Sequence, residues 1–336
     1  MAHASTIGRE QGLPPAASIA VVIPAYRVVA HVLDVIARIG PECERIYVVD
    51  DACPEGSGDK VEAECRDPRV QVVRHEVNRG VGGAVMTGYV HAIRDGADVI
   101  VKIDGDGQMD PRMLSRFVAP ILRGEADYTK GNRFFDLRQI RQMPLLRRIG
   151  NLGLSFMAKA STGYWDVFDP NNGYTAIHRE VAALLPMDSI SQRYFFETDM
   201  LFRLNTLRAA VVDIPMDAHY GDEVSNLRVS RVFSEFLLKH LRNFGKRLLY
   251  NYYLRDLSIA SLELVCGIVL LVFGGVFGAS AWLDSIQSGR AATVGTVMIP
   301  TLAVMLGVQL VLAFLAYDIA NIPRYPLHPR LRPDGR

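Results

Sequence analysis

The chain has 336 residues, 49% of them hydrophobic, which excludes a disordered protein and leaves room for one large domain or two smaller ones. Its 37 basic and 36 acidic side chains nearly cancel to a formal net charge of +1, so overall charge does not recruit nucleic acid, and we expect no nucleic-acid partner. The 4 cysteines are widely spaced without a CxxC pair, which argues against a structural zinc and a disulfide framework and favours a reducing compartment.

The first part of the chain alternates short β-branched runs with helical patterns. Residues 1–16 lack the apolar core of a signal peptide and are expected to form a flexible lead-in. Strands are predicted at 18–23, 45–50, 70–75 and 98–103, and helical segments between them at 28–39, 59–64 and 82–93. This alternation predicts an α/β fold with a doubly wound, mostly parallel sheet. Such sheets bind ligands at the carboxyl ends of their strands, which here are the segments 24–27, 50–59, 76–83 and 104–111.

The pattern after residue 125 is less regular. We expect one more strand with its loop (ADYTKGNRF), a basic helix around MPLLRRIGNLGLSFMAKA, the loop DVFDPNNGY, a helix with two acids (RYFFETDMLFRLN) and a last strand (AAVVDIPM). Residues 17–228 are therefore assigned to one soluble domain.

The C-terminal part predicts a membrane anchor. Residues 229–257 are amphipathic, basic and aromatic, and are expected to lie on a membrane surface. The apolar windows 259–283 and 292–317 each exceed the roughly 20 residues needed to span a bilayer, which predicts a two-helix transmembrane hairpin formed by residues 258–318. Buried core helices of a soluble protein are the alternative.

The charges beside the hairpin predict its orientation. Arginine and lysine crowd both outer flanks, and the short connecting loop has only Arg290, so the positive-inside rule places the soluble domain, both termini and a basic tail at 319–336 in the cytoplasm. The small residues in GGVFGAS (274–280) suit packing against further copies, so a homo-oligomer is an open prediction.

The stretch VKIDGDGQMDP (101–111) places a cluster of acids directly behind an apolar strand. Asp104 and Asp106 flank one glycine and can converge on one cation, and Gln108 can add a neutral oxygen, which are ligands suited to Mg²⁺ or Mn²⁺. A surface turn is the alternative, because Asp and Gly are ordinary turn residues. Asp110, followed by Pro111, is predicted to be the N-cap of the next helix.

Four segments in order resemble a known family. They are VVIPAY (21–26), VVDDACPEGSGD (48–59), NRGVGGAVMTGY (78–89) and the D-x-D-x-Q pattern of 104–108. Together they resemble the family-2 inverting glycosyltransferases, and within them the polyprenyl-phosphate branch that includes dolichol-phosphate mannose synthase and undecaprenyl-phosphate glucosyltransferases. The resemblance covers roughly residues 18–230 and implies a GT-A type fold for the α/β domain.

The resemblance also implies roles for individual residues. The implied catalytic residues are Asp104, Asp106, Arg133, Glu197 and Asp199. The implied donor-binding residues are Pro24, Ala25, Tyr26, Asp50, Asp51, Arg79, Gly80, Asp104 and Asp169. The implied ligands of an acceptor phosphate are Arg133, Arg147, Arg148 and Arg228. Structural alternatives stay open: a strand-ending turn for the acids at 50 and 51, helix-start packing for the glycines, and solvated helix faces for the 147–148 and 197–199 pairs.

The implied function is metal-dependent, inverting transfer of a sugar from a nucleotide-diphosphate donor, UDP- or GDP-linked, to a polyprenyl phosphate at the cytoplasmic membrane face. A glycan or glycolipid acceptor is the alternative enzyme, and a non-catalytic nucleotide-sugar-binding protein is the alternative class. Two departures from the family pattern bear on this. Arg27 and Val28 replace an asparagine and a glutamate, and in 220–229 Asn226 stands where a lysine is usual, so Arg228 is expected to supply that charge.

Overall fold

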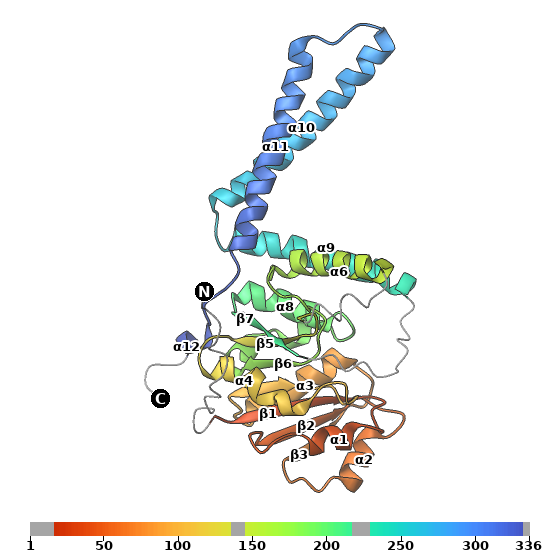
Figure 1. The fold of residues 1–336 in the computed structure, drawn as a ribbon, viewed down its shortest axis with the longest axis vertical. Coiled ribbons are helices and arrows are strands. Elements are labelled where there is room, and N and C mark those ends of the chain that lie inside the picture. The colour runs from red at the N-terminus through yellow and green to blue at the C-terminus, as the bar shows by residue number, and fades with distance from the viewer. Residues whose placement is uncertain (1–16, 136–144, 217–228, 332–336) are drawn as a thin grey trace, which may run out of the picture.

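The computed structural model describes residues 17–135, 145–216 and 229–331, and for 145–152 and 229–233 it describes the backbone alone. A single sheet forms the centre of the soluble domain (Figure 1). Its strands are β1 (Ile19–Ala25), β2 (Arg45–Asp50), β3 (Val70–Arg74), β4 (Val99–Lys102), β5 (Tyr128–Asn132), β6 (Thr175–His178) and β7 (Val211–Pro215). The order is β3-β2-β1-β4-β6-β5-β7, and β6 alone runs antiparallel to its neighbours, which confirms the predicted mostly parallel α/β fold.

Helices cover both faces of the sheet. Those of the soluble domain are α1 (Val32–Ala37), α2 (Ser57–Glu64), α3 (Val81–Arg94), α4 (Leu114–Leu122), α6 (Leu145–Thr162), α7 (Arg179–Ala183) and α8 (Phe196–Leu207). Successive side chains of a strand point to opposite faces. Val22 of β1 accordingly packs with Tyr89 of α3 and Leu201 of α8, while Val21 packs in a second cluster with Phe117 of α4.

Strand β6, near the candidate site, is not predicted from the sequence, because its 4 residues are too few to show a period. The helix predicted after Asp110 begins as a short 3₁₀ turn at Pro111–Met113, which leads into α4. The Asp110 carboxylate accepts a hydrogen bond from the Arg112 backbone N–H at 3.1 Å, so the predicted N-cap at Asp110 is confirmed, on that turn.

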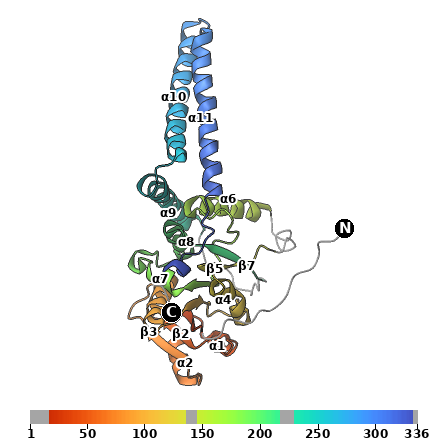
Figure 2. The same cartoon turned by 90° about the vertical axis from the view of Figure 1, so that its left-hand side faces the viewer.

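Helix α9 (Val229–Leu249) is amphipathic with its polar side inward. His240 Nδ1 lies 2.8 Å from Ser161 Oγ of α6, and Arg247 Nε donates to the Ala160 carbonyl oxygen at 3.0 Å. The outward face carries leucines, with Leu238 68% and Leu249 50% exposed, together with the exposed Arg242 and Lys246. Helices α6 and α9 lie side by side beneath the hairpin (Figure 2). Exposed leucines opposite buried histidine, asparagine and arginine side chains differ from the pattern of a helix surrounded by water, whose buried face is apolar.

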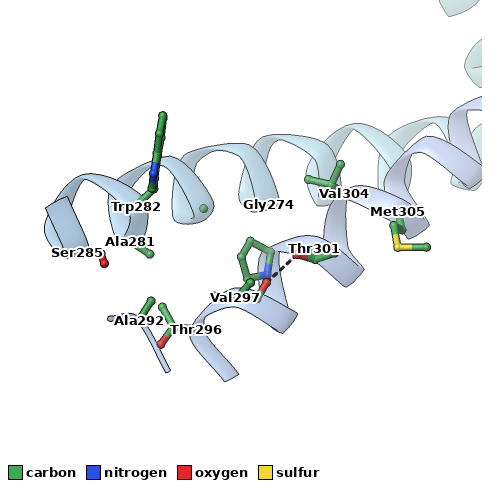
Figure 3. Close-up of a pocket in the computed structure, with 12 residues that line it drawn as sticks. Gly274, Ala281, Trp282, Ser285, Ala292, Thr296, Val297, Thr301, Val304 and Met305 are labelled. Atoms are coloured by element: carbon green, nitrogen blue, oxygen red, sulfur yellow. Dashed lines mark hydrogen bonds between the residues drawn. The ribbon is translucent and has the colours of Figure 1, made fainter. Parts of the chain in front are cut away.

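Two long apolar helices follow the soluble domain. They are α10 (Ile259–Ser288, 30 residues) and α11 (Val294–Ala320, 27 residues), and each is long and apolar enough to cross a membrane. They pack closely where Gly267 of α10 meets Gly307 of α11, because a Cβ on either glycine would lie 3.0–3.1 Å from the other's carbonyl oxygen. Nearer the connecting loop they form an open groove of about 480 Å³, lined mainly by small and apolar residues that include Gly274, Trp282 and Val304 (Figure 3).

The chain returns to the soluble domain after the hairpin. Arg208 donates to the Asn321 carbonyl oxygen at 2.8 Å. Further on, the buried Asp127 carboxylate at the start of β5 accepts hydrogen bonds from the backbone N–H groups of Leu327 and His328 and contacts His328 Nδ1 at 2.8 Å. Residues 321–331, with α12 (His328–Leu331), therefore form a strap across the domain, whereas the sequence predicts only a basic tail.

Candidate active site

The carboxyl ends of β1, β2, β4 and β5 form one edge of the sheet, because these strands are parallel. Strand β6 runs the other way, so the loop that enters it, residues 169–174, lies at the same edge. This arrangement brings Tyr26, Asp104, Arg133 and Asp169 to one side of the molecule. It is the position at which open α/β sheets bind ligands.

Asp104 is held by a buried lysine. Lys102, the last residue of β4 and 1% exposed, places its Nζ 2.8 Å from Asp104 Oδ1 and 3.5 Å from Glu197 Oε1 at the start of α8. Burial lowers the pKa of Lys102, but the charges of Asp104 and Glu197 outweigh it, so the pKa lies above its ordinary value. The lysine is therefore charged and fixes both carboxylates. Gly173 packs against them so closely that there is no room for a side chain, since a Cβ there would lie 2.6 Å from Lys102 Nζ.

A second buried lysine lies two strands away. Lys130 of β5 donates from Nζ to the Asn172 carbonyl oxygen at 2.5 Å. Thr175 of β6 is the register partner of both Lys102 and Lys130, so the three side chains lie in a row on one face of the sheet. Burial lowers the pKa of Lys130 to about 8. The floor of the site thus has two cationic groups beneath its carboxylates.

Arg133 and Asp169 form a bidentate pair. Arg133 Nε lies 2.7 Å from Asp169 Oδ2, and one terminal nitrogen lies 3.1 Å from Oδ1. Asp169 is buried and also accepts from Asn172 Nδ2 at 3.2 Å, whereas the Arg133 side chain stays 30% exposed. Two parallel bonds fix the plane of a guanidinium. Asp169 thereby orients Arg133, which is a suitable donor for an anionic ligand.

Asp213 of β7 supports the loop that carries Asp169. Its Oδ2 accepts from the Phe168 backbone N–H at 2.9 Å and from Asn132 Nδ2 at 3.1 Å. Burial raises the pKa of Asp213 to about 6. The carboxyl group therefore titrates close to neutral pH while holding the loop in place.

Asp50 has its carboxylate engaged by the protein. Its two oxygens accept from the backbone N–H groups of Cys53 at 2.8 Å and Gly58 at 2.7 Å, so they cap the loop that leads into α2. The carboxylate is buried. This geometry shows the strand-ending turn, and a donor-binding role of Asp50 remains a prediction.

Asp51 likewise organises the following loop. It accepts from the backbone N–H groups of Arg79 at 2.8 Å and Gly80 at 2.7 Å, and lies 2.7 Å from His75 Nδ1. Gly80 has φ +86, and a Cβ there would collide with the carbonyl group of Gln192. The position thus requires glycine for packing at the start of α3, and donor contacts of Gly80 and Arg79 remain predictions.

Glu197 and Asp199 have different environments although they are two residues apart. Glu197 faces Lys102, whereas Asp199 Oδ2 accepts from the Ser191 backbone N–H at 2.9 Å and from Arg203 Nε at 3.1 Å. Asp199 Oδ1 accepts from Asn243 Nδ2 of α9 at 3.0 Å. Asp199 therefore connects α8, the loop before it and α9, and its predicted catalytic role remains a prediction.

The loop after β1 carries the exposed Tyr26, which follows the partly buried Pro24 and the buried Ala25. Arg27 next to it has φ +58, and Ala52 in the neighbouring loop has φ +51, both in the left-handed region that non-glycine residues rarely adopt. Strained backbone of this kind clusters at ligand sites. These two loops are therefore candidates for the wall of a nucleoside pocket.

The remaining predicted cations are placed only in part. Arg147 and Arg148 lie at the start of α6, and the structure describes their backbone alone. Arg228 lies outside the described residues. Their contact with an acceptor phosphate remains a prediction.

The carboxylates fit a hard divalent cation by their chemistry. Asp104 and Asp106 are partly buried oxygen ligands at the edge of the sheet, with Gln108 beside them, and Asp106 Oδ1 also accepts from the Gln108 backbone N–H at 3.0 Å. Within the ranges that the structure describes, no group of three or more His, Cys, Asp or Glu side chains is placed to hold a metal. A cation at this edge would thus need further oxygen ligands, such as those of a diphosphate.

Comparison with known proteins agrees with this geometry. Residues 20–185 match the family model described as glycosyl transferase family 2. An uncharacterised protein of Methanocaldococcus jannaschii is 32% identical over 64% of this chain and 87% of its own length. The chain is a family 2 glycosyltransferase.

The named relatives of this transferase belong to the polyprenyl-phosphate branch. The undecaprenyl-phosphate mannosyltransferase of Micrococcus luteus is 29% identical over 58% of this chain and 81% of its own. The polyprenol monophosphomannose synthase of Mycolicibacterium smegmatis is 29% identical over 62% and 82%. These relatives confirm the branch that the sequence motifs indicate.

A solved structure confirms the GT-A fold of the transferase. The glucosyl-3-phosphoglycerate synthase of Mycobacterium tuberculosis, in complex with Mg²⁺ and uridine diphosphate, superposes with a TM-score of 0.52 at 20% identity, covering 68% of this chain and 80% of the other. At this identity the likeness extends to the fold alone.

Sequence reasoning missed the residues beneath the carboxylates. Lys102 and Lys130 interrupt the runs DVIVKI and DYTKGN, and Asp213 interrupts AVVDIP. A charge within an otherwise apolar strand is costly unless it is paired. That signal was available in the sequence, but its partners in other elements were not.

Proposed function

We propose that this transferase moves a sugar from a nucleotide-diphosphate donor to a polyprenyl phosphate, with inversion, at the cytoplasmic face of a membrane. The observation that carries the proposal is the inverted amphipathicity of α9, whose polar side binds the catalytic domain and whose leucines face outward beside the hairpin. A surface of this kind suits the interfacial region of a bilayer. It would bring the site close to a lipid whose reactive group is in the headgroup region.

The charges beside the hairpin support the orientation. Arg242, Lys246 and Arg255 precede α10, and Arg324 and Arg330 follow α11. By the positive-inside rule, this side of the hairpin faces the cytoplasm. We assign residues 17–228 to the catalytic domain, 229–257 to the interfacial region, 258–318 to the hairpin and 319–336 to the cytoplasmic end.

The reaction requires no strong base. A phosphate monoester is already anionic at neutral pH, so one of its oxygens attacks the anomeric carbon as the bond to the donor diphosphate breaks. The nucleoside diphosphate leaves with the electron pair of that bond, and no proton has to be removed from the acceptor. Arg133, held by Asp169, is proposed to bind the acceptor phosphate.

The acids in the loop after β4 are proposed to hold the cation. Asp104, Asp106 and Gln108 would bind Mg²⁺ or Mn²⁺, which supplies positive charge to the leaving diphosphate when it is bound. Lys102 holds Asp104 in one orientation through the ion pair between them. Glu197, the second partner of Lys102, is proposed to orient the sugar rather than to remove a proton.

Purified protein in detergent or vesicles tests the proposal. With undecaprenyl phosphate, Mg²⁺ or Mn²⁺ and a panel of radioactive UDP- and GDP-sugars, we expect an organic-extractable product that mild acid hydrolyses. Transfer only to a glycan or glycolipid would overturn the acceptor assignment, and donor binding without release of nucleoside diphosphate would overturn catalysis.

Site variants test the metal assignment. Asp104→Asn and Asp106→Asn should each lower transfer by roughly 100-fold or more, because charge stabilisation of the leaving group is lost. Asp110→Asn is the matched control from the same stretch, since Asp110 caps a turn and pairs with Arg112. Equal activity of all three variants would contradict the metal assignment.

A further inference from the structure

The last turn of α11 carries a buried carboxylate that binds three other segments. Asp318 is 3% exposed and accepts two bonds from Arg247 of α9, at 2.6 and 2.9 Å. It also accepts from Tyr252 Oη at 2.5 Å and from the Trp165 indole N–H at 2.9 Å. We name these four residues the Asp318 cluster.

The Trp165 bond links the hairpin to a short segment that leads to the candidate active site. Trp165 begins the stretch 165–169, which ends at Asp169, the residue that orients Arg133. Four residues span at most about 14 Å, so a displacement at one end cannot be absorbed over a long segment. Within the stretch, the Phe168 backbone N–H donates to Asp213 of the sheet. The other end of the stretch is attached to the hairpin through Trp165.

The start of this loop is also built around the cluster. Gly163 has φ +80 and ends α6, and a Cβ there would lie 3.0 Å from Arg247 Cδ and Nη1. Arg247 itself is 1% exposed and donates to the Ala160 carbonyl oxygen of α6. The loop therefore follows the position of Arg247, and Asp318 fixes that position.

We infer that Asp318 is a positioning residue for the acceptor side of the site: through Trp165 and Arg247 it sets the 163–169 loop, and hence Asp169 and Arg133, relative to the membrane hairpin. The inference rests on the proposed function, in which Arg133 binds the acceptor phosphate. It assigns the hairpin a part in placing the acceptor in addition to anchorage. A charged group inside such a helix is costly unless paired, and here its partners are Trp165 of the catalytic domain and Arg247 and Tyr252 of the interfacial region.

Asp127 provides a matched comparison. It is also a buried carboxylate that attaches the segment after the hairpin to the domain, through Leu327 and His328. It lies at the amino end of β5, opposite the edge that carries Arg133. Loss of Asp127 should loosen the strap without displacing the 163–169 loop.

Kinetic constants of the full-length protein in vesicles test the inference. Trp165→Phe removes the indole N–H together with part of the ring, and Asp318→Asn removes the charge at nearly constant size. We expect each to raise the KM for undecaprenyl phosphate about 5- to 20-fold, while the KM for the nucleotide sugar changes less than 2-fold. Asp127→Asn should change neither constant by more than 2-fold.

Fluorescence gives a readout independent of activity. The chain has 2 tryptophans, so in a Trp282→Phe background all tryptophan fluorescence comes from Trp165. Asp318→Asn should shift and weaken its emission, while Asp127→Asn should not.

Each outcome has a distinct meaning. If the wild type transfers sugar to undecaprenyl phosphate but Trp165→Phe and Asp318→Asn leave the acceptor KM unchanged, or raise both KM values equally, the inference is wrong and the proposed function stands. A rise in the donor KM alone would also overturn it. Absence of transfer by the wild type to any prenyl phosphate would instead refute the proposed function.

Discussion

Replacing Gly173 by alanine should disable the site without unfolding the protein. A methyl group at this position would lie 2.6 Å from Lys102 Nζ, 2.9 Å from Met109 Cε and closer still to Asp104 Oδ2. Ordinary contacts are near 3.5–4.0 Å, so Lys102 and Asp104 must each retreat by roughly 1 Å. A displacement of about 1 Å at a reacting site can lower the rate about 100-fold.

The expected cost in stability is smaller. Inserting one methyl group into a packed region typically costs about 1–3 kcal/mol, and Met109 has a flexible side chain that can move. We therefore expect Gly173→Ala to lower kcat/KM for sugar transfer by about 100-fold, with a thermal midpoint only a few degrees below that of the wild type. Binding of Mn²⁺ in the presence of the donor, followed by paramagnetic resonance, should weaken in parallel.

Gly153→Ala is the control for this substitution. Gly153 lies in α6, and a methyl group added there would meet no neighbouring atom within 4 Å, so alanine should leave the kinetic constants unchanged. Wild-type kcat/KM and Mn²⁺ binding in Gly173→Ala would refute the claim that the fixed position of Asp104 beside Lys102 is needed for catalysis.

Three further predictions concern the surrounding framework. Burial raises the pKa of Asp127, but hydrogen bonds from His328, Leu327 and Ala210 outweigh burial, so the folded pKa lies below the unfolded value of 3.8. The stabilisation by this carboxylate is present above the unfolded pKa and is lost as the pH falls through the folded pKa. Hydrogen exchange of residues 321–331 should therefore rise in acid, and it should rise less in Asp127→Asn. Burial lowers the pKa of His240 to about 4, so docking of α9 should weaken as the pH falls from about 6.5 toward 4, and His240→Asn should abolish that dependence of α9 exchange; an unchanged profile would contradict the buried neutral imidazole. Gly80→Ala should lower the free energy of unfolding by about 1–3 kcal/mol, and with it the thermal midpoint, because φ +86 and the Gln192 carbonyl both disfavour a Cβ. A variant as stable as the wild type would show that the start of α3 can accommodate a side chain.

The regular half of the fold was predictable because its signals are local. The strands β1 to β4 and helix α3 show clear periods, and four motifs in order identify the family and the edge of the sheet where the site lies. Asp110 is a local case of the same kind, since its cap is formed with a neighbour two residues away.

The roles of individual acids were less predictable because they depend on distant partners. Asp50, Asp51 and Asp199 follow or begin regular elements in the expected places, yet their carboxylates bond to backbone and side chains brought by the fold. Nothing in FFETDM distinguishes Glu197, which faces a lysine of β4, from Asp199, which faces α9. The pairing of β6 against β4 and β5, which aligns Lys102 with Lys130, likewise has no counterpart in local sequence.

The strap has a consequence for biosynthesis. Asp127 meets its partners Leu327 and His328 about 200 residues later in the chain, after both hairpin helices have been made. During translation the emerging catalytic domain would expose a carboxylate destined for a buried position, and this contact of very high sequence separation can form only after both hairpin helices have been synthesised. Maturation of the enzyme would then be ordered in time, with synthesis of the hairpin preceding the final closure of the domain, and a fragment ending before α10 would never reach that last step.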